Sequence, residues 1–401
     1  MELDKNSIFS IEDRSLAKTY MKRRIVITRG KGSHLWDIDG KKYIDCTTGY
    51  GVALAGHCHP KIVEAIREQL NLLNVCHGSF YNDARAQFLS KLIKITPKGL
   101  NRVFMGNSGA EAVECAIKVA RKSTKKTDII AMMKSYHGKT FGSLSATWNA
   151  KYRETFEPLV PGFAFAPYGK IERIREIITE KTAAIIAEPI QGEGGINVPP
   201  VGFFKELREL CDEKGLLLIA DEVQTGFGRT GKLWACEHWG MVPDIMTLSK
   251  PIAGGIPMSV TVARDDVMSS LTIGEHSSTF GGNPVACAAA SAFIDIIQEE
   301  NLVEKAATIG ADLKNDLEAL RSKHPVIREV RGMGLMLAAE FRFDVLDILL
   351  KTMEDGLLVL DAGRNVIRLL PPFVITPDDL AQVISIMDKV LNTGGNIPVR
   401  T

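Results

Sequence analysis

A carboxylate and a lysine each follow a short apolar run of this chain, and their types and spacing could do chemistry together. The segment Gly215-Leu-Leu-Leu-Ile-Ala-Asp221 reads as a buried strand that ends in a carboxylate. Asp244-Ile-Met-Thr-Leu-Ser-Lys250 is a second apolar run, and it ends in a lone lysine. Pyridoxal phosphate needs a lysine for its Schiff base and a carboxylate that keeps its pyridine nitrogen protonated. The pair Asp221 and Lys250 therefore predicts a pyridoxal phosphate site.

Two glycine- and hydroxyl-rich segments could bind the phosphate of such a cofactor. In Asn107-Ser108-Gly109-Ala110-Glu111, Ser108 and Glu111 have the spacing of a capping box that opens a helix. A helix N-terminus binds phosphate through free N–H groups and its dipole, and the small residues permit close approach. The loop 275–284 can supply further donors. Without Lys250 and Asp221, both segments would read as ordinary helix entries.

Tyr136 follows another apolar run, in Tyr136-His-Gly-Lys139. An aromatic ring at the end of a strand can stack on a flat cofactor. In isolation, a core aromatic residue would be the commoner interpretation.

Elements that could position these residues alternate along the chain from about Pro60 to Ala290. Strands alternating with amphipathic helices predict an α/β fold with a mostly parallel sheet covered on both faces. Ligands of such sheets bind beyond the carboxyl ends of the strands. Asp221, Lys250 and Glu188 all stand at such ends. The apolar runs read as strands are 103–106, 129–133, 183–187, 216–220, 245–248 and 258–263.

The length of the chain indicates how many domains it forms. The 401 residues exceed the roughly 250–300 residues of a single core, which predicts more than one domain. We expect an N-terminal segment 1–52, with a hairpin at 33–45, to pack with a C-terminal α+β unit 301–401. Residues 53–300 would form the large domain.

The net charge is +1, without a long basic run, which argues against nucleic acid as a partner. No apolar run reaches the roughly 20 residues that cross a bilayer. The seven cysteines form no CxxC pair and favour a reducing cytoplasm.

Two alternative sites, a metal site and a P-loop, are argued against by the residues present. His57-Cys58-His59 suggests a metal, but adjacent residues of an extended chain point to opposite faces, so no metal is expected. Gly226-Phe-Gly-Arg-Thr-Gly-Lys232 has P-loop spacing. A P-loop requires Ser or Thr after its lysine, and Leu233 stands there.

From about Tyr43 to Thr376 the chain resembles the class III aminotransferases, which are fold-type I pyridoxal phosphate enzymes. The segments that carry the resemblance, beyond those quoted above, are Gly56-His-Cys-His-Pro60, Glu188-Pro-Ile-Gln-Gly-Glu193, Asp221-Glu-Val-Gln-Thr-Gly226, Ser278-Thr-Phe-Gly-Gly-Asn-Pro284 and Arg368-Leu-Leu-Pro-Pro372. The resemblance implies a large domain with a mostly parallel, seven-stranded sheet and a smaller α+β domain. It also implies a homodimer whose active site lies at the interface.

The resemblance carries roles onto matching positions. Lys250 would form the internal aldimine and move the proton, Asp221 would pair with the pyridinium nitrogen, and Tyr136 would stack on the ring. The phosphate would be held by Ser108, Gly109 and Ala110, with Thr279 of a neighbouring subunit. Val223 and Gln224 would contact the cofactor. Glu193 and Arg368 resemble a switch pair that lets one site accept an ω-amine and a dicarboxylate, and Ser278 would contact substrate.

The closest resemblance is to the acetylornithine-like subgroup, whose members act on ornithine or lysine precursors. The run Ser143 to Pro158 resembles the branch whose substrates are tethered to a small acidic amino-group carrier protein. Lys139 replaces the usual arginine that grips the substrate carboxylate, and Tyr50 resembles free-ornithine enzymes; Pro251 is also unusual. We expect transfer of an ω-amino group to 2-oxoglutarate, with glutamate as product. Carrier-bound, acetylated and free amines stay open, as does 4-aminobutyrate.

A protein of this family that lacks activity and serves as an interaction protein is the alternative from another functional class. Such a protein would tend to lose Lys250 or Asp221, and both are present.

Overall fold

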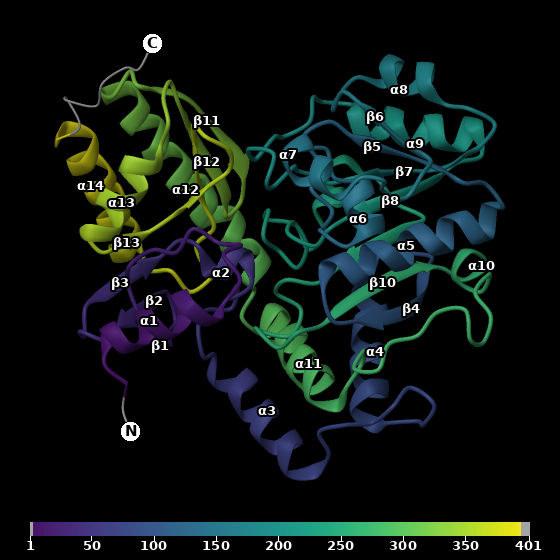
Figure 1. Ribbon diagram of the computed structural model, residues 1–401, viewed down its shortest axis with the longest axis horizontal. Coiled ribbons are helices and arrows are strands. Elements are labelled where there is room, and N and C mark those ends of the chain that lie inside the picture. The colour runs from purple at the N-terminus through teal and green to yellow at the C-terminus, as the bar shows by residue number, and fades with distance from the viewer. Residues whose placement is uncertain (1–2, 394–401) are drawn as a thin grey trace.

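A seven-stranded sheet forms the centre of the larger lobe in the computed structural model, which describes residues 3–393 (Figure 1). Among the described residues, β10 is the antiparallel strand of this sheet, and its other strands run parallel. The predicted α/β class with a mostly parallel sheet is therefore confirmed. In spatial order the strands are β4 (Leu100–Gly106), β10 (Ser259–Arg264), β9 (Ile245–Leu248), β8 (Leu217–Asp221), β7 (Thr182–Ala187), β5 (Asp128–Met132) and β6 (Phe163–Ala166).

The central strands are mostly apolar because helices cover both faces of the sheet. Every residue of β7, β8 and β9 is buried. Strand β6 was not among the predicted strands, since its four residues alternate phenylalanine and alanine without a longer run. The helices of this lobe are α3 (Pro60–Leu72), α4 (Asp83–Ile95), α5 (Gly109–Thr124), α6 (Phe141–Ser145), α7 (Ala150–Arg153), α8 (Ile171–Ile177), α9 (Phe203–Lys214), α10 (Asp265–Met268) and α11 (Pro284–Glu299), with 3-10 turns at Glu154–Phe156 and Ala235–Trp239.

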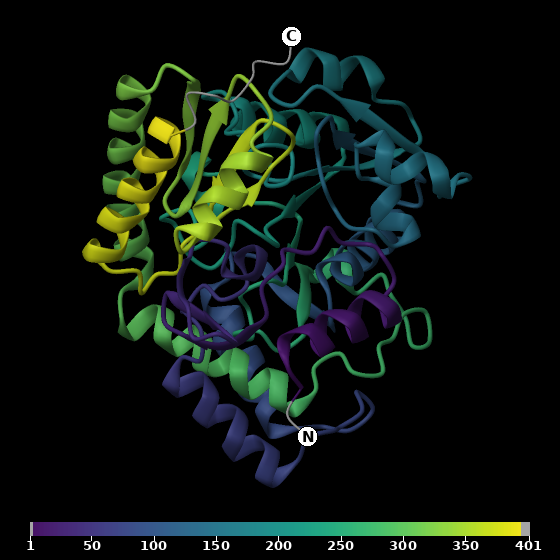
Figure 2. The same ribbon diagram turned by 60° about the vertical axis from the view of Figure 1, so that its left-hand side comes forward.

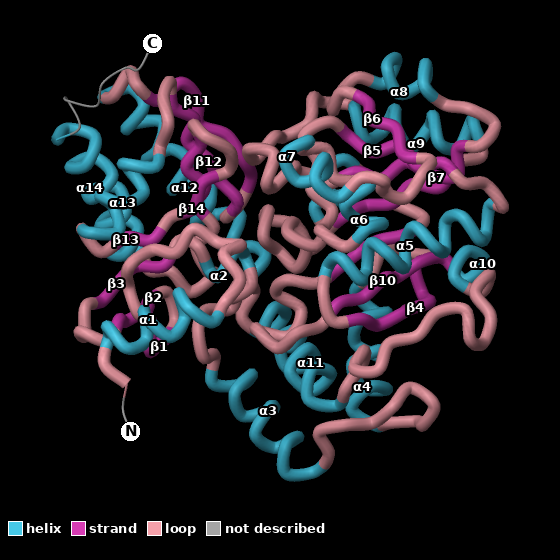
Figure 3. The backbone as a smooth tube through the Cα atoms, viewed as in Figure 1, coloured by secondary structure: helices cyan, strands magenta, loops and turns pink. Residues whose placement is uncertain are grey.

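The smaller lobe is built mainly from the C-terminal region and carries an antiparallel sheet in the order β11-β12-β15-β14 (Figure 3). It begins after Asn301, whose left-handed backbone (φ 52°) separates α11 from the next helix. Its elements are α12 (Leu302–Lys323), β11 (Ile327–Met333), β12 (Met336–Phe341), α13 (Leu346–Glu354), β13 (Leu357–Leu358), β14 (Leu360–Asp361), β15 (Val366–Leu369) and α14 (Pro377–Thr393).

The N-terminal hairpin joins this C-terminal lobe, as Figure 2 shows from the side. Strand β3 pairs in parallel with β13, and Ile44 and Cys46 pack in one core with Leu337 and Phe341. The boundaries at residues 52 and 300 stay a prediction. The N-terminal elements are α1 (Lys5–Ser15), β1 (Ile27–Lys31), β2 (His34–Asp37), β3 (Lys42–Asp45) and α2 (Thr48–Gly51).

No helix within residues 3–393 is long and apolar enough to cross a membrane. Over the same range, no group of three or more His, Cys, Asp or Glu side chains could hold a metal ion. The imidazoles considered for a metal contact carboxylates: His57 Nε2 lies 2.7 Å from Asp45 Oδ2, and His59 Nε2 lies 3.4 Å from Glu300 Oε1.

Candidate active site

A cavity of about 500 Å³ lies beyond the carboxyl ends of the parallel strands. Asp221 is the last residue of β8, and Lys250 stands two residues after β9. Glu188 directly follows β7. The strand ends converge here, as expected for a ligand site of a parallel sheet. Among the predicted site residues, the cavity is lined by Gly109, Ala110, Tyr136, Lys139, Glu193, Asp221, Val223, Gln224 and Lys250.

The Lys250 amine lies in an environment that favours its neutral form. Burial lowers the pKa of Lys250, and the nearby guanidinium of Arg368 acts in the same direction. The carboxylates of Glu193 and Asp221 oppose that shift, but the pKa stays below its ordinary value. A neutral amine is the nucleophilic form of lysine, so the lowered pKa is the direction that a Schiff-base lysine requires.

Asp221 is buried and oriented by three hydrogen-bonding groups. Its Oδ1 accepts from the Thr247 hydroxyl at 3.0 Å and from the Val223 N–H at 3.1 Å. Its Oδ2 lies 2.6 Å from Nδ1 of His137, an imidazole that is itself buried. These contacts fix the plane of the carboxylate, because both of its oxygens are engaged.

Glu188 forms a second buried carboxyl group at the back of the cavity. It accepts hydrogen bonds from the N–H groups of Tyr136 at 2.9 Å and Gly192 at 3.0 Å. Burial raises the pKa of Glu188 to about 7, with Asp221 contributing and His137 opposing. Glu188 therefore anchors the backbone of the residue whose ring faces the cavity.

The start of α5 has the properties that a phosphate requires. Ser108 is the N-cap, and its Oγ accepts from the Glu111 N–H at 3.3 Å. The N–H groups of the first helical turn have no partner within the helix, and they carry its positive dipole end. A side chain at Gly109 would lie 2.8 Å from a methyl group of Val223, so only glycine fits there. A lysine, a buried carboxylate and this anion site at one cavity fit the donor set of pyridoxal phosphate.

The loop that carries Ser278 and Thr279 lies outside the residues that line the cavity. Ser278 Oγ accepts from Asn107 Nδ2 at 3.1 Å and from the Gly281 N–H at 3.0 Å, which ties the loop to the segment before α5. Thr279 is exposed. Within one chain the structure does not bring Thr279 to Lys250.

Arg368 and Glu193 form an ion pair beside the cavity. Nη1 of the fully buried Arg368 lies 2.6 Å from Glu193 Oε1 and 3.3 Å from Gln224 Oε1. Burial would raise the pKa of Glu193, but Arg368 and Lys250 outweigh it, and the pKa of Glu193 is lowered. The carboxylate thus stays ionised and neutralises the guanidinium.

The structure places Lys139 and Tyr50 against different partners. The exposed Lys139 Nζ lies 4.4 Å from the centre of the Tyr152 ring. The Tyr50 ring lies 5.5 Å from the Arg368 guanidinium carbon. The roles of Lys139 and Tyr50 in binding substrate therefore stay predictions.

Several residues around the cavity received no role from the sequence, and His137, Tyr152 and Tyr20 are the aromatic ones. His137 stands within the Tyr136–Lys139 segment, where a buried imidazole beside a carboxylate could have been considered. Tyr152 packs edge-on against Tyr136, with ring centres 6.1 Å apart. Tyr20 lines the cavity from the polar N-terminal segment, which gave no signal of such a contact.

Comparison with known proteins decides the family. The class III aminotransferase family model matches residues 15–391. The chain belongs to the class III aminotransferases. It is therefore a pyridoxal-phosphate-dependent enzyme, which confirms the predicted family, cofactor and reaction class. The P-loop interpretation of residues 226–232 is thereby set aside.

Relatives cover nearly the whole chain. The protein is 42% identical over 386 residues to an acetylornithine aminotransferase of Methanocaldococcus jannaschii, covering 95% of this chain and 96% of the relative. It is 44% identical to a [LysW]-aminoadipate semialdehyde transaminase of Deinococcus radiodurans, over 93% of this chain and 87% of the relative. Among solved structures, an ornithine aminotransferase from Toxoplasma gondii ME49 superposes with a TM-score of 0.95 at 34% identity, covering 99% of this chain and 97% of that one.

Proposed function

We propose that this class III aminotransferase moves the ω-amino group of an ornithine- or lysine-type substrate to 2-oxoglutarate, giving a semialdehyde and glutamate. The observation that carries this proposal is the pair of buried Arg368 and Glu193, 2.6 Å apart beside the cavity. A site that handles both a terminal amine and a dicarboxylate needs a cation that can be either neutralised or exposed. The names of relatives, which act on acetylornithine or on LysW-bound aminoadipate semialdehyde, support this substrate class.

The residues of the cavity divide the work of binding and proton transfer. When bound, pyridoxal phosphate supplies an electron sink for the negative charge that develops next to the reacting nitrogen. Lys250, held toward its neutral form, acts as nucleophile and then moves the proton at the reacting carbon. Asp221 would keep the pyridine nitrogen protonated, and the Tyr136 ring would pack on the face of the cofactor. Gln224, which accepts a hydrogen bond from Arg368, would lie near the ring oxygen of the bound cofactor.

The phosphate would be held at the start of α5 by Ser108, Gly109 and Ala110, where Val223 packs against Gly109. Thr279 would complete this site from a neighbouring subunit, since it is exposed and away from the cavity of its own chain. We accordingly propose that the protein forms a homodimer.

The pair Glu193 and Arg368 provides dual specificity. With an ω-amine donor, Glu193 neutralises Arg368, so the amine meets no unpaired positive charge. With 2-oxoglutarate, Glu193 swings away and the guanidinium binds a carboxylate through two parallel hydrogen bonds. Tyr50 covers Arg368 on one side and would contact the same substrate group.

Lys139 is the candidate for the far carboxylate of the ω-amine substrate. It lines the cavity, and its ammonium is exposed. Tyr20 lines the same cavity and can donate a phenolic hydrogen bond there. Because a lysine is a point charge, this grip tolerates variation near the α-nitrogen. Ser278 accepts a hydrogen bond from Asn107 and lies on a loop outside the residues that line the cavity. Any contact of Ser278 with substrate would therefore be made through that loop.

Three donors follow from this proposal: N-acetylornithine, a substrate on an acidic amino-group carrier protein, and free ornithine. Tyr50 favours free ornithine as the second candidate. We propose that the enzyme acts in the reducing cytoplasm. The first two donors would give it a role in arginine or lysine biosynthesis. Steady-state kinetics with each donor and 2-oxoglutarate tests the proposal. One donor should exceed the others in kcat/KM, and absence of turnover with all three would refute it.

A further inference from the structure

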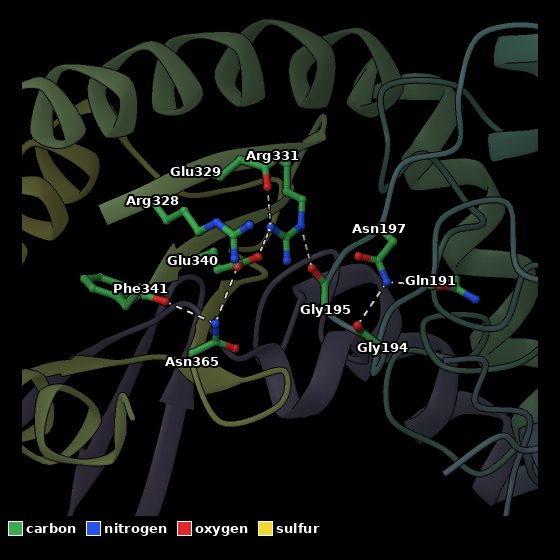
Figure 4. Close-up of polar contacts among 10 residues, drawn as sticks. All are labelled: Gln191, Gly194, Gly195, Asn197, Arg328, Glu329, Arg331, Glu340, Phe341 and Asn365. Carbon is green, nitrogen blue, oxygen red and sulfur yellow. Dashed lines mark hydrogen bonds and ion pairs between the residues drawn. The ribbon is translucent and has the colours of Figure 1, made fainter. Parts of the chain in front are cut away.

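The loop 191–197 presents Glu193 to the cavity and is closed on itself. The backbones of Gln191 and Asn197 exchange two N–H···O hydrogen bonds of 3.1 Å each. Asn197 Nδ2 donates to Gln191 Oε1 and to Gly194 O, both at 3.0 Å (Figure 4). Gln191 Nε2 donates to Met133 O at 2.7 Å, which attaches the loop to the large lobe.

On its other side the loop is attached to the small lobe by Arg331 of β11. Arg331 Nε donates to Gly195 O at 2.9 Å (Figure 4). The same guanidinium pairs through Nη1 with Glu340 at 2.5 Å and Glu329 at 2.9 Å. Because two carboxylates hold one end of the planar group, the direction of the Nε–H is fixed. The Arg331 side chain is 14% exposed, so water competes little for this contact.

Arg331 and Arg368 lie in one row of the small-lobe sheet. Arg331 pairs with Ala338 across β11 and β12, and Ala338 pairs with Arg368 across β12 and β15. Directly opposed residues project from the same face, and two strand spacings separate their backbones by about 10 Å. One face of this sheet therefore reaches the loop twice: Arg368 at the carboxylate of Glu193, and Arg331 at the carbonyl of Gly195.

We propose that Arg331 is a positioning residue, which holds the backbone of this loop so that Glu193 neutralises Arg368. The inference rests on the proposed switch function of that pair. While the pair is closed, both arginines hold the loop. When a carboxylate substrate displaces Glu193, Arg331 keeps the loop in place, so only the Glu193 side chain has to move. Without Arg331, Glu193 would neutralise Arg368 less completely, and α-amino acids would compete better as donors.

The test compares Arg331→Met with Arg328→Met as a matched control. Arg328 pairs with the same Glu340 at 3.0 Å but is 64% exposed and, within residues 3–393, forms no hydrogen bond or ion pair with the loop. The measured quantity is kcat/KM for the best of the three ω-amine donors divided by kcat/KM for L-glutamate as donor. Loss of one hydrogen bond predicts a fall of about threefold to tenfold for Arg331→Met. Arg328→Met should leave the ratio within about 1.5-fold, as surface ion pairs contribute little.

Glu193→Gln separates this inference from the proposed function. That variant alone should lower the same ratio, and Arg331→Met added to it should cause no further fall. If Glu193→Gln leaves the ratio unchanged, the proposed switch is wrong. If Glu193→Gln lowers it but Arg331→Met does not, or Arg331→Met lowers it equally in both backgrounds, the positioning role is wrong.

If Arg331→Met does not fold, Arg331→Lys is measured in its place. Lysine keeps the charge between Glu340 and Glu329 but lacks the Nε–H that reaches Gly195, so the ratio should still fall. An unchanged ratio in a folded Arg331→Lys would refute the positioning role.

Discussion

Replacing Asp221 by asparagine changes one atom and removes the charge on which the proposed electron sink depends. In the wild-type protein, Asp221 Oδ1 accepts from the Thr247 hydroxyl at 3.0 Å and from the Val223 N–H at 3.1 Å. Asp221 Oδ2 lies 2.6 Å from His137 Nδ1. An asparagine can keep its oxygen toward Thr247 and Val223. Its NH₂ group would then face His137 and the pyridine nitrogen of the bound cofactor, where a hydrogen-bond acceptor is needed.

The size of the effect follows from the burial of this carboxylate, which is 4% exposed. A charge-assisted interaction that stabilises the reacting state in a water-excluded site contributes about 3–4 kcal/mol. Asp221→Asn should therefore lower kcat by about 10²- to 10³-fold. The phosphate site and Lys250 stay intact, so binding of the cofactor should weaken much less than kcat falls.

The assay is single-turnover kinetics at saturating pyridoxal phosphate, with occupancy measured from the absorbance of the bound cofactor. Thr247→Val is the control, since it removes one neutral hydrogen bond to Asp221 and should cost less than about tenfold. A fully loaded Asp221→Asn enzyme with near-wild-type kcat would refute the reasoning.

Four further outcomes are expected. Lys250→Ala should abolish turnover, and borohydride reduction of the wild type should attach the cofactor at Lys250; mass spectrometry that finds another lysine modified would contradict this. Arg368→Ala should raise the KM for 2-oxoglutarate, and an unchanged KM would disprove its role. Lys139→Ala should lower kcat/KM for the native amine about tenfold or more, as for loss of a charged hydrogen bond of ~1.5–3 kcal/mol; no change with any donor would place the carboxylate elsewhere. Burial raises the pKa of Glu222 to about 7. Its contribution to stability is therefore full below its ordinary pKa and is lost as the pH rises through about 7. Thermal unfolding of Glu222→Gln should depend less on pH in that window than the wild type, and parallel curves would count against the shift.

The local sequence pattern was sufficient to predict those elements whose formation depends on residues adjacent in the chain. Apolar runs identified β4, β5, β7, β8, β9 and β10 to within a few residues, because strands in a sheet that helices cover on both faces are mostly apolar. The strand ends at Asp221 and Lys250 followed from the same runs. Since parallel strands present their carboxyl ends at one edge, those two residues had to lie at a common site. Strand β6 was not predicted because its four residues, which alternate in size, are too short an apolar run to identify a strand.

The switch pair shows what the sequence could suggest only by resemblance. Glu193 and Arg368 are 175 positions apart, and their 2.6 Å contact depends on how the two lobes meet. The contact of His137 with Asp221 spans 84 positions, and no spacing rule predicts it. Tyr20 and Arg331 gave no local signal at all, since a polar segment and a charged strand residue usually face solvent.

Local sequence specifies six of the seven strands of the large sheet and the helix that begins after Ser108, because each depends on periodicity or capping within a few residues. Which charges neutralise one another follows from the tertiary structure alone. The order and register of the strands bring Arg331, Ala338 and Arg368 into one row and set the loop of Glu193 against it. Such contacts join residues far apart in the chain, and their geometry follows from the packing of whole elements.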